Sequence, residues 1–86
     1  MVTPESVKSG IAGGLACEHL EVIGDGQHFQ ALVVARAFAG KSRVQRHQLV
    51  YRALGERMRE EIHALSMQTL TPEEFASMGG VPASDG

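Results

Sequence analysis

The sequence is poor in the residues that define several common classes of protein. It holds one cysteine, Cys17, which excludes an internal disulfide framework and a metal site built from cysteines alone. Aromatic residues make up 5% of the chain, too few for a platform on which nucleic-acid bases stack. No apolar run approaches the roughly 18 residues of a membrane span, and the first residues lack the basic-then-apolar layout of a secretion signal. These absences favour a reduced, cytoplasmic compartment and no membrane partner.

The 86 residues are enough for one small domain. Hydrophobic residues make up 43% and charged residues 21%, which is ordinary for a globular domain. We expect residues 1–78 to form that domain. Residues 79–86 have almost nothing to bury, and we expect them to be a flexible tail.

The net charge of −2 is distributed unevenly along the chain. Residues 1–35 sum to −3, residues 36–59 to +6 and residues 60–86 to −5. A basic segment can attract an anionic partner, or it can be the solvated face of a helix. The sequence leaves both interpretations open.

The first half of the chain carries the signals of a helix and a β-hairpin. Thr3-Pro4-Glu5 favours a helix start, and Gly13-Gly14 favours its end. Alternating apolar residues then predict strands at 15–23 and 28–35, and Gly24-Asp25-Gly26 between them is a turn signal. The residues expected on one face of the second strand are Phe29, Ala31, Val33 and Ala35.

The second half predicts a long helix, a strand and a short helix. Ser42 can cap a helix from 43 to about 61, with Gly55 as a point where it bends or splits. A third strand is expected at 63–70, and a capping box from Thr71 to Glu74 begins the last helix. The apolar arc of the long helix comprises Val44, His47, Val50, Tyr51, Leu54, Met58 and Ile62, with the arginines outside it.

The element order is therefore αββαβα, an α/β (α+β) arrangement with one three-stranded sheet. A crossover through one helix returns the chain to the end where it started, so the third strand should run parallel to the second. This topology brings the starts of the two strands, at His28 and His63, to the same end of the sheet.

These two histidines are the best candidates for chemistry. Two imidazoles can fill two positions of a metal centre but cannot complete a four-ligand site, so other ligands would have to come from a partner chain. We interpret His19 as a surface residue and His47 as a hydrogen-bonded structural histidine. We interpret Cys17 as a small buried residue.

The sequence does not favour an enzyme. No nucleophile, base and acid form a recognisable set, and there is no P-loop. Gly24-Asp25-Gly26 resembles a dinucleotide-binding fingerprint only in part, because it opens no helix.

Five short segments stand out together: Gly24-Asp25-Gly26-Gln27-His28-Phe29, Phe38-Ala39-Gly40-Lys41-Ser42, Val44-Gln45-Arg46-His47-Gln48-Leu49-Val50-Tyr51, Ile62-His63-Ala64-Leu65-Ser66 and Thr71-Pro72-Glu73-Glu74-Phe75. In this order and spacing they resemble the BolA family, and within it the bacterial IbaG-like subgroup, over roughly residues 3–76. The resemblance implies a BolA or class II KH-like fold, with a three-stranded mixed sheet and helices packed on one face. The chain lacks the Gly-X-X-Gly loop of true KH domains, since Leu54-Gly55-Glu56-Arg57 has no second glycine.

The resemblance also implies a function. BolA-like proteins pair with monothiol glutaredoxins, and the heterodimer can hold a [2Fe–2S] cluster together with glutathione; no cofactor is expected in the isolated chain. The family's histidine ligand in the Ile-His-Ala-Leu stretch corresponds to His63. The second ligand lies in the loop between the first two strands, where His28 is the candidate and Asp25 stands where some members carry cysteine. We therefore expect a non-enzymatic adaptor in iron–sulfur cluster trafficking or iron homeostasis.

The alternative is a nucleic-acid-binding transcriptional regulator. Some relatives are described as transcription factors, and basic residues of the central segment would then contact phosphates. The acidic flanks, the missing loop and the few aromatic residues oppose this interpretation. The sequence leaves open which protein receives the cluster and whether the free chain forms a homo-oligomer. The basic residues that would contact phosphates in a nucleic-acid complex are Lys41, Arg43, Arg46 and Arg52.

Overall fold

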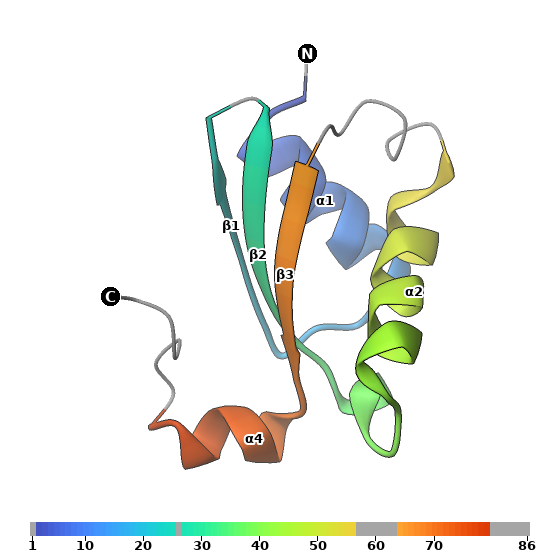
Figure 1. The fold of residues 1–86 in the computed structure, drawn as a ribbon, viewed down its shortest axis with the longest axis vertical. Helices are drawn as coiled ribbons and strands as arrows, with labels where there is room; N and C mark the ends of the chain where they lie inside the picture. Colours follow the sequence, from blue (N-terminus) through green and yellow to red (C-terminus); the bar gives the residue numbers. More distant parts are fainter. Residues whose placement is uncertain (1, 26, 57–63, 80–86) are drawn as a thin grey trace.

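A computed structural model of the protein describes residues 2–25, 27–56 and 64–79. These residues include three α-helices and a 3-10 turn beside one sheet with the strand order β1-β2-β3 (Figure 1). Within the described ranges, no helix is long and apolar enough to cross a membrane. The elements are α1 (Pro4–Gly14), β1 (His19–Gly24), β2 (His28–Val34), η1 (Arg36–Phe38), α2 (Arg43–Leu54), β3 (Ala64–Leu70) and α4 (Pro72–Ser77).

Each of the three α-helices begins with a capping box, in which the cap side chain and the side chain three residues later satisfy free backbone N–H groups. The cap residues are Thr3, Ser42 and Thr71. The hydroxyl of Thr71, for example, accepts from the backbone N–H of Glu74 at 3.1 Å. The three helix starts that the sequence predicts are therefore confirmed.

The sheet is mixed, as expected. β1 runs antiparallel to β2, and β3 runs parallel to β2, with His28 opposite Ala64 at one end and Val34 opposite Leu70 at the other. The expected first strand at 15–23 is wrong at its beginning, because Leu15 is the C-cap of α1 and donates its N–H to the carbonyl of Ile11. The chain needs the residues before His19 to pass from the helix to the sheet.

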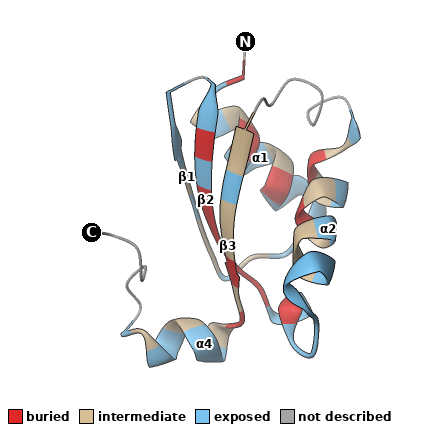
Figure 2. Ribbon diagram, in the orientation of Figure 1, coloured by how far each residue is buried: buried red, intermediate tan, exposed pale blue. Residues whose placement is uncertain are grey.

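The hydrophobic core lies between one face of the sheet and the helices α1 and α2 (Figures 1 and 2). α2 contributes Val50 and Leu54 to this core, as predicted, while Met58 lies outside the described residues. The other buried members include Val7 and Ile11 of α1, and Phe29, Ala31 and Val33 of β2.

One expectation for the long helix is confirmed and one is wrong. α2 ends at Leu54, where the sequence predicts a bend or split, because Gly55 takes a φ of 84°, outside the helical range, and serves as the C-cap. Residues 57–61 of the expected helix lie outside the described residues. Val44, expected on the buried face, is 65% exposed. It belongs to the first turn of α2, which extends beyond the end of α1 (Figure 1).

Among the described residues, the face of the sheet opposite α1 and α2 meets a helix at one end. There Phe75 of α4 stacks on His19 of β1 with ring centroids 4.9 Å apart. His19 also pairs with the carboxylate of Glu21. His19 is therefore half-buried between a carboxylate and a ring, rather than a free surface residue.

Candidate functional site

His28 is the first residue of β2, and its side chain is 74% exposed. Its partner across the ladder is Ala64, the first residue of β3. The starts of the two parallel strands therefore lie side by side, which confirms the topology inferred from the crossover. His63 directly precedes Ala64 in the chain and lies outside the described residues, so its proximity to His28 stays a prediction.

The turn before β2 orients a carboxylate toward this histidine. Asp25 Oδ1 accepts hydrogen bonds from the backbone N–H groups of His28 and Gln27, both at 2.9 Å. These two bonds, that of His28 first, lower the pKa of Asp25 and keep the carboxylate ionised. The other oxygen, Oδ2, lies 4.0 Å from His28 Nδ1. An imidazole and a carboxylate, both able to bind a transition metal, thus share one exposed turn.

The core fixes the position of this turn. Phe29 is 1% exposed and follows His28 directly, so its burial holds the start of β2 in place. At Gly24, a Cβ atom would lie 2.5 Å from Phe29 Cδ1, so the close approach of backbone and ring requires glycine. The ligand candidates are therefore exposed groups on a rigid support.

The described residues do not complete a metal site. No group of three or more histidine, cysteine, aspartate or glutamate side chains gathers within 2–25, 27–56 and 64–79. A four-ligand centre at this edge needs further ligands, from His63, from a partner chain or from both.

The imidazole of His47 and the thiol of Cys17 serve the fold. His47 is half-buried on α2, and burial, followed by the nearby charge of Arg43, lowers its pKa. The thiol of Cys17 packs against the core and donates to the carbonyl of Leu15 at 3.3 Å. Burial raises the pKa of this thiol, which favours the unreactive protonated form.

Three of the four predicted basic residues, Lys41, Arg43 and Arg52, are exposed. Arg46 differs, because its side chain is 14% exposed and points into the protein. Its Nη1 donates to the carbonyl of Thr69 at 3.0 Å and to Glu74 Oε1 at 2.8 Å. Sequence reasoning placed Arg46 among the solvent-facing arginines and missed this contact. Glu74, recognised only as part of a capping box, also accepts from Arg46.

The arrangement defines a class of protein: a small α+β domain with a mixed three-stranded sheet and an exposed imidazole and carboxylate at one sheet end. Comparison with known proteins identifies the class. A family model described as BolA-like protein matches residues 11–74, and the chain belongs to the BolA family.

Three relatives illustrate the similarity. The chain is 39% identical over 71 residues to the acid stress protein IbaG of Escherichia coli K12, covering 81% of this chain and 84% of that protein. It is 40% identical over 52 residues to the DNA-binding transcriptional regulator BolA of Haemophilus influenzae, covering 60% of this chain and 50% of that one. A solved structure of a BolA homologue from Coxiella burnetii, 44% identical, superimposes with a TM-score of 0.74 over 88% of this chain and 99% of the other.

Proposed function

We propose that this protein is a non-enzymatic adaptor in iron–sulfur cluster trafficking or iron homeostasis. It pairs with a monothiol glutaredoxin, and His63 and His28 ligate a [2Fe–2S] cluster that the two proteins share. The remaining ligands are the glutaredoxin cysteine and the thiolate of glutathione. The iron–sulfur role rests on the family resemblance, and the geometry of the sheet supports it.

The observation that supports this proposal most is the parallel pairing of His28 with Ala64. This pairing places the residue that follows His63 in the chain directly opposite the second candidate ligand. The incomplete ligand set within the described residues agrees with a cluster shared between two chains.

The residues at the edge suit such a cluster chemically. A neutral imidazole in place of a thiolate makes an iron–sulfur cluster less negative and raises its reduction potential. An imidazole must lose its proton before it binds metal, so acid favours release of the cluster. Asp25 lies beside His28 and can either orient the imidazole or replace it as the loop ligand.

The test is co-purification with the host's monothiol glutaredoxin, followed by iron and sulfide analysis and a visible spectrum. His63→Ala should keep docking of the cluster-free proteins, which depends on a broader surface, but it should lose or alter the spectrum of the heterodimer. His47→Ala is the matched control, since His47 lies on α2 away from the edge. A His63→Ala heterodimer with an unchanged spectrum and cluster lifetime would show that the proposed ligation is wrong.

A second candidate function is nucleic-acid binding by the basic helix. The observations that favour it are the exposed side chains of Lys41, Arg43 and Arg52 and the name of the Haemophilus influenzae relative. Arg46 supports it less, because its guanidinium is already hydrogen-bonded to Thr69 and Glu74. A mobility-shift titration tests it, since phosphate contacts predict an affinity that falls steeply with salt concentration.

A further inference from the structure

The strand β3 has one edge that no other described strand covers. It is the last strand in the order β1-β2-β3, and within the described ranges it pairs with β2 alone. Leu70 directs its carbonyl inward, where it accepts from Ala35 N–H at 3.0 Å, whereas Thr69 directs its carbonyl outward to Arg46. Because backbone directions alternate along a strand, the outward N–H and C=O groups are those of Leu65, Met67 and Thr69.

Most of these outward groups lack a partner in the part of the chain that the structure describes. The carbonyl of Thr69 accepts from Arg46, and no hydrogen bond reaches the outward groups of Leu65 and Met67. An unpaired strand edge is a template for another strand, and proteins commonly shield such edges with charges, prolines or bulges. Here a shielding charge is present at the Thr69 end alone.

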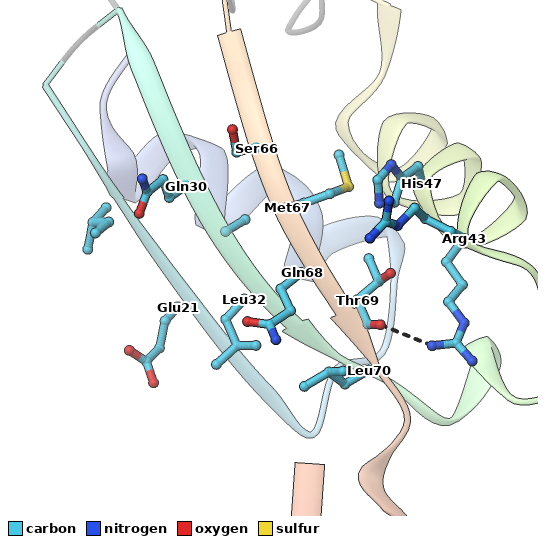
Figure 3. Close-up of a pocket in the computed structure, with 13 residues that line it drawn as sticks. Glu21, Gln30, Leu32, Arg43, His47, Ser66, Met67, Gln68, Thr69 and Leu70 are labelled. Carbon is cyan, nitrogen blue, oxygen red and sulfur yellow. Dashed lines mark hydrogen bonds between the residues drawn. The ribbon is translucent and has the colours of Figure 1, made fainter. Parts of the chain in front are cut away.

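A hollow of about 800 Å³ reaches this edge, and its lining continues across the sheet to β2 and β1. Met67 and Thr69 line it on the side of α2, and Ser66 and Gln68 line it on the opposite side of the strand. Figure 3 shows Met67 extending from β3 toward His47 of α2. Because residues on both sides of β3 border one hollow, the strand edge between them is accessible to a ligand.

The wall formed by α2 includes Arg43, Arg46 and His47. Arg43 is exposed with no ion pair to any residue that the structure describes. Arg46, by contrast, is paired with a carboxylate of α4, and burial lowers the pKa of His47, which favours its neutral form. Glu21 is the carboxylate in the lining, and it lies on the other face of the sheet, where it pairs with His19. A chain placed along the edge would therefore meet positive charge on its α2 side. No phenylalanine, tyrosine or tryptophan lines the hollow, so it offers no ring on which a nucleic-acid base would stack.

We propose that the free edge of β3 is a docking site for an extended acidic peptide of a partner protein, which adds to the sheet as a fourth strand. Main-chain hydrogen bonds to Leu65 and Met67 supply affinity, as in other cases of strand addition. Side chains of a strand alternate between two faces, so every second side chain of the peptide faces α2, and these are the acidic ones. The docking groups lie on the outer edge of β3, whereas His28 begins β2 on the inner side of that strand, and strand addition uses no cluster ligand.

The first experiment screens two display libraries of eight-residue peptides against the complete protein. In one library acidic residues alternate with valine, isoleucine or threonine, and in the other lysine and arginine take the acidic positions. The acidic library should enrich and the basic one should not. Equal enrichment, or none, would overturn the proposal.

Backbone methylation of an enriched peptide then tests strand addition without altering the protein. N-methyl groups on one alternating set of residues remove the donors that face β3, and binding should weaken at least about tenfold. Methyl groups on the other set face away and should leave the affinity unchanged. If both sets weaken binding equally, the peptide does not bind as a strand.

Three protein variants, one of them a control, locate the site. Arg43→Glu should weaken binding of the acidic peptide about five- to tenfold, and the new carboxylate suits the first helical position, so the fold is kept. Lys41→Glu is the matched control, with the same change of charge outside the hollow, and should leave binding nearly unchanged. Met67→Pro removes an outward N–H without touching the ladder to β2, and it should weaken binding as well. Equal losses for Arg43→Glu and Lys41→Glu, or competition of the peptide by single-stranded DNA with equal affinity, would refute a peptide groove.

Discussion

At one end of the sheet, Arg46 joins α2, β3 and α4 through Thr69 and Glu74, whereas at the other end His28 has a side chain that is 74% exposed. We call the first the anchored end and the second, with Asp25, His28 and Ala64, the open end. At the anchored end, the side chains of Arg46 and Glu74 satisfy each other and the carbonyl of Thr69, so these three groups have little capacity left to bind a ligand. The open end keeps polar groups exposed on a backbone that the core holds rigid, as a ligand site requires.

Both ends depend on the same core, so a substitution in the core should cause the largest loss of stability. Leu54→Ala should reduce the free energy of unfolding by about 2–4 kcal/mol, because Leu54 is 7% exposed and its removal leaves a cavity beneath the sheet. Urea denaturation of the two proteins measures the loss. Val44→Ala on the same helix is the control and should change stability by less than about 0.5 kcal/mol, since Val44 is 65% exposed. Similar losses in both variants would mean that the packing face of α2 is wrong.

The anchored end should account for the next largest effect. Arg46→Met keeps the length of the side chain and removes its bonds to Thr69 and Glu74, for a loss of about 1–2 kcal/mol. Thermal unfolding measures it. Arg52→Met removes an exposed charge from the same helix and should be nearly neutral. If the two variants lose equal stability, Arg46 is not an anchor.

The difference between the two ends was only partly predictable from the sequence. The helix starts could be predicted, because a cap and its partner lie three residues apart. The parallel pairing of β2 and β3 could also be predicted, because a single-helix crossover allows few other arrangements. The contact from Arg46 to Glu74 was not, because it joins residues 28 apart that no local pattern links. The exposure of Val44 was missed for a similar reason: it depends on where α1 ends in space.

The candidate site could likewise be predicted from the sequence only in part. Chain topology predicted that His28 and the start of β3 share one sheet end, and the structure confirms this. The hydrogen bonds that Asp25 accepts from the backbone N–H groups of Gln27 and His28 follow from a turn geometry that the sequence only suggests. The assignment of His63 as a ligand rests on family resemblance, because a lone histidine carries no local signature of metal binding.

The stability of the fold should depend on pH through His47. The pKa of His47 is lowered in the folded protein by burial and by Arg43, so the unfolded chain binds the proton more tightly. The contribution of neutral His47 to the free energy of unfolding is complete above the ordinary histidine pKa of 6.5. It is lost as the pH falls through the lowered pKa of the folded state. Between pH 7.5 and 5.5 the native protein should therefore lose more stability than His47→Gln, by less than about 1 kcal/mol. Parallel curves for the two proteins would contradict this role.

The smallest expected effect on stability belongs to the open end. His28→Ala should change the free energy of unfolding by less than about 0.5 kcal/mol, because the imidazole is 74% exposed and lies 4.0 Å from the carboxylate of Asp25. The same variant should alter the visible spectrum of the complex with glutaredoxin, more mildly than His63→Ala if Asp25 replaces the lost ligand. Adding Asp25→Asn to His28→Ala should then remove the substitute ligand and alter the visible spectrum further. A large loss of stability in His28→Ala would mean that the open end supports the fold as the anchored end does. An unaltered spectrum in the double variant would mean that neither side chain of the turn ligates the cluster.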